Sequence, residues 1–117
     1  MTIMWGLKNC DTCRRARRWL ETRGIVFTFH DVREDTPDRD RLSRWLKAVG
    51  ADVLVNRRGT TWRSLSESAK RKIETGEITP ILEQYPALLK RPILEHGRQI
   101  RVGFDTTSYK TLFGASQ

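Results

Sequence analysis

Two cysteines, Cys10 and Cys13, are the residues of this chain whose type and spacing point most directly to chemistry. They follow a short apolar run at residues 3–5 that predicts a strand, and they precede a pattern that predicts a helix. Backbone N–H groups at a helix N-terminus lack partners within the helix, and the helix dipole is positive there. Both effects favour a thiolate, the nucleophilic form of cysteine, so Cys10 is the predicted nucleophile.

Cys13 follows Cys10 by about one helical turn, which is close enough for the two to form a disulfide. We therefore predict that Cys13 resolves the adduct formed at Cys10. The alternative, that Cys13 merely packs as a small buried residue, stays open. Lys8 and Arg14 are expected to add positive charge that favours ionisation of Cys10.

Zinc binding is the other common use of two cysteines at this spacing. A structural zinc site needs four ligands, and only His30 and His96 remain as histidine ligands. They do not form a second closely spaced pair, so no metal site is expected.

The charge balance favours anionic partners. The 117 residues include 22 Lys and Arg against 14 Asp and Glu, a net charge of +8, which suits oxyanions, glutathione carboxylates, acidic protein surfaces or nucleic acid. No secretory signal is visible, and no run approaches the roughly 20 apolar residues of a membrane span. A cytoplasmic protein is expected, where paired cysteines are redox-active or metal-binding rather than structural.

The order of the predicted elements indicates an α/β fold. Strands at residues 2–6 and 25–30 flank a helix that begins near Asp11 or Thr12, which is a parallel βαβ unit. Helical segments fill residues 36–89, with Thr36 as the cap of the first, and a hairpin and a final helix follow. We predict one domain over residues 1–117, with a four-stranded mixed sheet at about 1–33 and 90–117 and an all-helical insertion at about 36–89.

Six segments carry a resemblance that spans nearly the whole chain. They read WGLKNCDT (5–12), ARRWLE (16–21), FHDVR (29–33), NRRGTTWR (56–63), KRPIL (90–94) and VGF (102–104). In this order they resemble the arsenate reductase (ArsC)/Spx family, closest to its YffB-like branch. The resemblance implies a thioredoxin-like fold.

The resemblance also implies roles for single residues. Cys10 matches the nucleophilic cysteine, Arg58 and Arg91 match arginines that bind the anionic substrate, and Pro92 matches a cis-proline. Arg101 is the only candidate for a third arginine. The remaining predicted site residues are Lys8 and Asn9 for the anion, and Thr12 as a structural residue.

Three functions are compatible with this resemblance. The favoured one is a thiol–disulfide oxidoreductase that binds no cofactor and uses glutathione as co-substrate. The second is a redox switch that, like Spx, binds the C-terminal domain of the RNA polymerase α subunit. The third is arsenate reduction, resolved by glutathione and glutaredoxin. Cys13 departs from the many relatives with one cysteine here. A monomer without direct nucleic-acid or membrane contact is expected.

Overall fold

The chain divides into two compact units in the computed structural model, which describes residues 1–114. The first unit comprises Met1–Glu34 and Arg91–Gln117, and the second comprises Asp35–Lys90. Each of the four boundaries lies one residue from the boundary predicted between the sheet-containing core and the helical insertion. That the two form one domain stays a prediction.

The first unit is built on a four-stranded mixed sheet, as predicted. Its strands β1 (Thr2–Gly6), β2 (Thr28–Asp31), β3 (Ile93–His96) and β4 (Gln99–Val102) lie in the order β2-β1-β3-β4. Strand β1 runs parallel to β2 and antiparallel to β3, and β3 runs antiparallel to β4. In the register, Met4 of β1 pairs with Phe29 and Leu94. This topology confirms the predicted thioredoxin-like fold.

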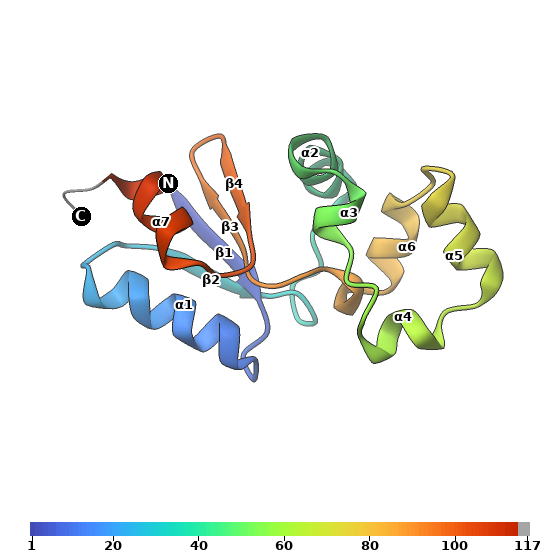
Figure 1. The fold of residues 1–117 in the computed structure, drawn as a ribbon, viewed down its shortest axis with the longest axis horizontal. Coiled ribbons are helices and arrows are strands. Elements are labelled where there is room, and N and C mark those ends of the chain that lie inside the picture. The colour runs from blue at the N-terminus through green and yellow to red at the C-terminus, as the bar shows by residue number, and fades with distance from the viewer. Residues whose placement is uncertain (115–117) are drawn as a thin grey trace. The chain divides into compact units, whose positions relative to one another are not determined.

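Two helices, α1 (Asp11–Thr22) and α7 (Thr106–Phe113), contribute to the core on one face of this sheet (Figure 1). Helix α1 turns one apolar stripe inward, and α7 starts where the side chain of Asp105 accepts a hydrogen bond of 2.9 Å from the backbone N–H of Thr107. The buried residues of this core are Met4, Ala16, Trp19, Leu20, Leu94 and Tyr109. Burial of apolar area between the helices and the sheet is what stabilises the unit.

One predicted boundary in this unit is wrong. Helix α1 begins at Asp11, as predicted, with Cys10 as its N-cap residue. Strand β2 begins at Thr28 rather than at residue 25, because the Ile25 N–H donates back to the Leu20 carbonyl at 3.0 Å. The β-branched and aromatic residues after the helix are therefore partly used for packing before the strand starts.

The second unit is helical, as predicted. It contains α2 (Arg39–Val49), α3 (Ala51–Leu54), α4 (Thr60–Ser64), α5 (Glu67–Glu74), α6 (Thr79–Gln84) and the 3-10 turn η1 (Pro86–Leu88). Helix α2 is capped by Asp38, which accepts from the Arg41 N–H at 2.9 Å, and not by Thr36. The fully buried side chains of this unit are Leu42, Trp45, Leu54, Leu82, Leu88 and Leu89.

One isolated bridge organises the polar turn of the second unit. Val55 pairs with Leu89, the Asn56 N–H donates to the Leu88 carbonyl at 2.7 Å, and the Lys90 N–H donates to the Leu54 carbonyl at 2.8 Å. These bonds hold the segment just before the turn at residues 56–59 against residues 88–90, the last residues of the unit. Over residues 1–114, no helix has the length and apolar character needed to cross a membrane.

Candidate functional site

The loop between β1 and α1 delivers Cys10 to the start of the helix. The Cys10 N–H donates to the Leu7 carbonyl at 3.4 Å, and the Cys10 carbonyl accepts from the Arg14 N–H at 2.9 Å as the first bond of the helix. The Cys10 side chain is half-buried. Its sulfur therefore stands at the positive end of the α1 dipole while it remains accessible.

Asp31 fixes this loop from the end of β2. Its Oδ2 accepts from the Lys8 N–H at 3.0 Å, and its Oδ1 accepts from the Arg33 N–H at 2.9 Å. The Lys8 carbonyl in turn accepts from Arg17 at 3.4 Å. Both backbone groups of Lys8 are thus held, two residues before the reactive cysteine.

The charge state of Asp31 suits this role. Burial raises the pKa of its carboxyl, but the Lys8 and Arg33 N–H groups and the Arg33 guanidinium outweigh burial and lower that pKa. Sequence reasoning missed Asp31 as a site residue, although it lies within the FHDVR segment. The signal available in the sequence is an acidic residue at the end of a predicted strand.

The thiol of Cys10 ionises more readily than an ordinary cysteine. Burial raises its pKa, but several groups outweigh burial: the Cys13 N–H, the Cys13 thiol, the Thr12 N–H and the Arg91 guanidinium. The net result is a lowered pKa for Cys10. The mechanism predicted from the sequence, a helix N-terminus plus nearby cations, therefore operates at Cys10.

The cation that lowers the pKa of Cys10 differs from the predicted ones. Lys8 Nζ forms an ion pair with Glu34 at 2.7 Å, and Arg14 pairs with Asp11, the first residue of α1. The sequence assigned the favourable charge to Lys8 and Arg14, whereas the structure assigns it to Arg91.

Cys13 lies behind Cys10 and is fully buried. Burial, with a smaller contribution from neighbouring Cys10, raises the pKa of the Cys13 thiol to about 11. A Cβ atom on Gly6 would lie 2.6 Å from Cys13 Sγ, so only glycine allows β1 to run this close to the sulfur. Both cysteines are free thiols in this structure.

Tyr109 of α7 is a further neighbour of Cys13 that sequence reasoning placed only in the core. Its side chain is fully buried, and its hydroxyl has no hydrogen-bond partner among the described residues. Burial and the Cys13 charge raise the pKa of Tyr109, so this hydroxyl stays protonated. An unpaired phenol thus stands in the field of the buried thiol.

Arg91 and Pro92 lie at the end of the sheet where the cysteine loop begins. The peptide bond between them is cis, as the resemblance implied. Because Trp5 pairs with Ile93, the register sets Pro92 across from Gly6, the last residue of β1. Strand pairing therefore brings Arg91, far away in sequence, to the loop that carries Cys10.

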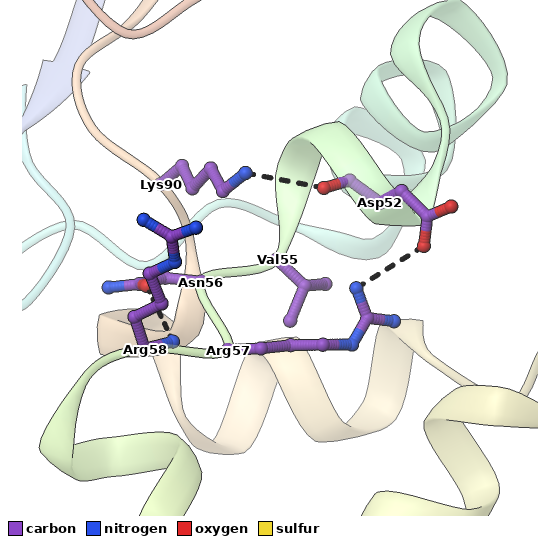
Figure 2. Close-up of a pocket in the computed structure, with 6 residues that line it drawn as sticks. All are labelled: Asp52, Val55, Asn56, Arg57, Arg58 and Lys90. Atoms are coloured by element: carbon purple, nitrogen blue, oxygen red, sulfur yellow. Dashed lines mark hydrogen bonds and ion pairs between the residues drawn. The ribbon is translucent and has the colours of Figure 1, made fainter.

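Arg58 lies in the polar turn of the second unit, where it lines a pocket of about 420 Å³ (Figure 2). Arg57 reaches the Asp52 carboxylate at 3.3 Å, and Lys90 Nζ donates to the Asp52 carbonyl at 3.3 Å. Asn56 Oδ1 accepts from the Arg58 N–H at 3.0 Å. Within the described residues, the Arg58 guanidinium forms no hydrogen bond or ion pair, so it is available to an anion.

Within the described part of the chain, the other predicted residues make no contact that assigns them a role in binding. Asn9 is exposed, and Thr12 contributes its backbone N–H to Cys10. Arg101 donates to the Ile100 carbonyl and to Gln99, within its own hairpin. Across residues 1–114, no three His, Cys, Asp or Glu side chains gather as metal ligands.

The family model that matches the chain decides its membership. The ArsC family model covers residues 5–112, from β1 to the last helix. The chain belongs to the ArsC family. This membership and the readily ionised Cys10 thiol agree with a thiol-based redox function.

Three known proteins illustrate the breadth of the similarity. A structure of a YffB protein is 33% identical, with a TM-score of 0.91 over 97% of this chain and 100% of that one. An arsenate reductase (ArsC) related protein from Brucella melitensis is 38% identical, with a TM-score of 0.72 over 96% and 93%. The global transcriptional regulator Spx of Streptococcus pneumoniae is 29% identical over 99 residues, which are 83% of this chain and 74% of that protein.

Proposed function

We propose that this ArsC family protein is a thiol–disulfide oxidoreductase that uses glutathione. The observation that carries the proposal is the accessible Cys10 thiol at the N-terminus of α1, with its pKa lowered by backbone N–H groups, by Cys13 and by Arg91. A lowered pKa raises the thiolate fraction near neutral pH, and the thiolate is the attacking species.

The first step is attack of Cys10 on a disulfide substrate. The Cys10 thiolate forms a bond with one substrate sulfur, the substrate S–S bond breaks, and the departing sulfur takes the electron pair and a proton from solvent. The Cys13 thiol stabilises the attacking thiolate by a hydrogen bond. Cys10 is thus the only nucleophile of the two, and Cys13 assists it by stabilising its thiolate.

Glutathione resolves the mixed disulfide in this proposal. Cys13 is fully buried, and its pKa is raised to about 11, so it is a poor nucleophile at neutral pH. The thiolate of glutathione attacks the substrate sulfur of the adduct and forms a new disulfide with it. Cys10 leaves as the thiolate. The reducing cytoplasm is the compartment that supplies this thiol.

The guanidinium group of Arg91, which belongs to the same unit as Cys10, binds a carboxylate of glutathione or another anionic substrate. Arginine suits this role because its planar fork of donors matches a carboxylate. Lys8 and Asn9 add donors on the cysteine loop. Arsenate is a further oxyanion that Arg91 would bind, and release of arsenite from the purified protein with glutathione would assign that activity.

Mass spectrometry after exposure to oxidised glutathione tests the proposal. The expected product is a glutathione adduct on Cys10 that persists in the Cys13→Ser variant and is absent from Cys10→Ser. An internal disulfide between Cys10 and Cys13 would assign resolution to Cys13. The oxidoreductase function would be overturned if Cys10 were not modified and its alkylation rate showed the pH profile of an ordinary cysteine.

A redox-responsive regulator is the second candidate, favoured by the similarity to Spx over most of this chain. In that case the chain would bind the C-terminal domain of the RNA polymerase α subunit in one redox state. A binding measurement with that domain under oxidising and reducing conditions separates the two functions. Absence of binding in both redox states would exclude the regulator function.

A further inference from the structure

Helix α1 carries a stripe of arginines on the side opposite its buried stripe. Cys13, Ala16 and Leu20 face the core, whereas Arg14, Arg15 and Arg18 are exposed. With Asp11, these three arginines line an open depression of about 430 Å³. Positions 11, 14, 15 and 18 share one side of a helix because they are separated by three or four residues.

The positions of these cations are unfavourable for the helix itself. Positive charge is favoured near the C-terminus of a helix and disfavoured near its N-terminus. Arg14 and Arg15 nevertheless lie in the first half of α1, whose last turn has no basic residue. Arg14 and Arg18 are also four residues apart, where like charges repel. The ion pair of Arg14 with Asp11 offsets part of this repulsion, and an anionic occupant would offset the rest.

Two of the arginines are free to contact such an occupant. Arg14 pairs with Asp11, but Arg15 and Arg18 form no hydrogen bond or ion pair with any residue from 1 to 114. Their neighbour Arg17 differs, because its guanidinium covers the Phe29 ring at 4.4 Å.

The stripe is continuous with the reactive residue. Cys10 is the N-cap of the same helix, so the distance along the axis from residue 10 to residue 18 is roughly 12 Å at 1.5 Å per residue. An extended peptide advances about 3.3 Å per residue, so roughly four residues next to a substrate sulfur would lie along the arginines. The surface therefore fits a protein segment whose own cysteine reaches Cys10.

A protein segment fits this surface better than a nucleic acid. Proteins that bind single-stranded nucleic acids present exposed aromatic rings on which the bases stack. The aromatic rings near the stripe are unavailable for stacking, because Trp19 is buried in the core and Phe29 lies under Arg17.

We propose that the Arg14, Arg15 and Arg18 face of α1 docks an acidic segment of a protein whose disulfide reacts at Cys10. The proposal rests on the oxidoreductase function and names its substrate class. In the exchange, Cys10 Sγ bonds to the partner cysteine, the partner's S–S bond breaks, and the leaving sulfur takes the electron pair and is protonated by solvent. The acidic flank raises the encounter rate and holds the partner cysteine over the thiolate.

Two matched peptides test the docking surface. Each carries one cysteine as a thiopyridyl mixed disulfide, followed either by four Asp and Glu residues or by four Asn and Gln residues. The full-length reduced protein should release thiopyridone from the acidic peptide faster by about tenfold at low salt, the lower end of electrostatic steering. This advantage should disappear in molar salt, where screening is nearly complete.

Variants then locate the effect. In Arg15→Ser/Arg18→Ser, the ratio of the acidic to the neutral rate should fall to near one. The matched control, Arg71→Ser/Lys72→Ser, removes the same charge from the exposed surface of α5 and should keep the ratio. Circular dichroism checks that each variant is folded.

The remaining outcomes are distinct. Equal rates for the two peptides in the unaltered protein overturn the docking surface, while reaction of both at Cys10 leaves the oxidoreductase intact. Lack of reaction with either peptide overturns both proposals. A single-stranded oligonucleotide that binds this face more tightly than the acidic peptide at equal salt would assign it to nucleic acid and overturn the protein partner.

Discussion

A methyl group on Gly6 would stand 2.6 Å from the sulfur of Cys13, so strand β1 and helix α1 meet where neither has room for another atom. The same added atom would lie 3.3 Å from Cε1 of Phe29. Gly6 is thus a packing requirement of the buried thiol. This contact couples the last residue of the central strand to the second cysteine.

Gly6→Ala should destabilise the reduced protein by about 1–3 kcal/mol, the usual cost of overpacking. The added carbon must displace either the buried Cys13 sulfur or the strand backbone. Urea unfolding followed by circular dichroism measures the change. The control is the same Gly6→Ala substitution in a Cys13→Ala protein, which lacks the clashing sulfur. There the substitution should lower the free energy of unfolding much less. An equal penalty in both backgrounds would show that the sulfur is not the cause.

Alkylation should distinguish the two cysteines by pH. The lowered pKa of Cys10 makes it react with iodoacetamide at neutral pH, whereas Cys13, with a pKa of about 11 and no exposed surface, should react only in strong alkali or after unfolding. Peptide mass spectrometry after timed labelling reads both rates. Similar labelling of both thiols at neutral pH would contradict the burial and charge assigned to Cys13.

Arg91→Met should raise the pKa of Cys10 and slow its alkylation at neutral pH. The reason is loss of the guanidinium, which favours the thiolate. The full pH profile of the alkylation rate is the measurement, because a pKa change moves its midpoint and leaves the alkaline plateau unchanged. Arg98→Met, in the exposed turn between β3 and β4, is the charge-matched control and should keep the original midpoint. A fall in the plateau alone would instead indicate lost access to the sulfur.

Asp31→Asn should destabilise the protein by about 1–3 kcal/mol at neutral pH, since an amide cannot accept from both N–H groups as a carboxylate does. The folded-state pKa of Asp31 is lowered, so its stabilisation is complete above the unfolded value of about 3.9 and is lost as pH falls through the folded-state value. The difference between wild type and variant should therefore shrink in acid.

Urea unfolding at neutral and acid pH measures that difference. Glu34→Gln is the control, because Glu34 pairs with Lys8 at the surface, where ion pairs contribute little. A difference between wild type and Asp31→Asn that does not change with pH would argue against a stabilising carboxylate.

Much of the fold was predictable because periodicity and turn residues carry local information. The β-α-β start and the cysteine-bearing loop follow from the apolar spacing around Cys10 and from Gly24, a glycine with positive φ just after α1. The closing hairpin follows from the alternation of apolar residues near the C-terminus. The start of β2 was not predictable, since a β-branched run is compatible with both strand pairing and packing. Only tertiary structure shows that Ile25 still bonds to the helix end.

The site was predictable in its nucleophile and less so in its surroundings. A cysteine just before a predicted helix can be recognised as a candidate nucleophile from the local sequence. The cation that acts on it does not, because Arg91 reaches Cys10 through strand pairing across most of the chain, while Lys8 and Arg14 are neutralised by local carboxylates. Tyr109 acts through three-dimensional proximity to Cys13, which no spacing in the sequence records. Asp31 stands visibly at the end of a predicted strand, but its bonds to the cysteine loop likewise depend on the fold.

The position of Cys10 as the N-cap of α1 has a consequence for redox equilibrium. The backbone N–H groups and Arg91 stabilise a charged sulfur, and any disulfide at Cys10 removes that charge. The fold therefore favours the free Cys10 thiolate over a disulfide at this residue. Cys10 is thus a good leaving group, so a mixed disulfide formed there should be readily reduced by a second thiol.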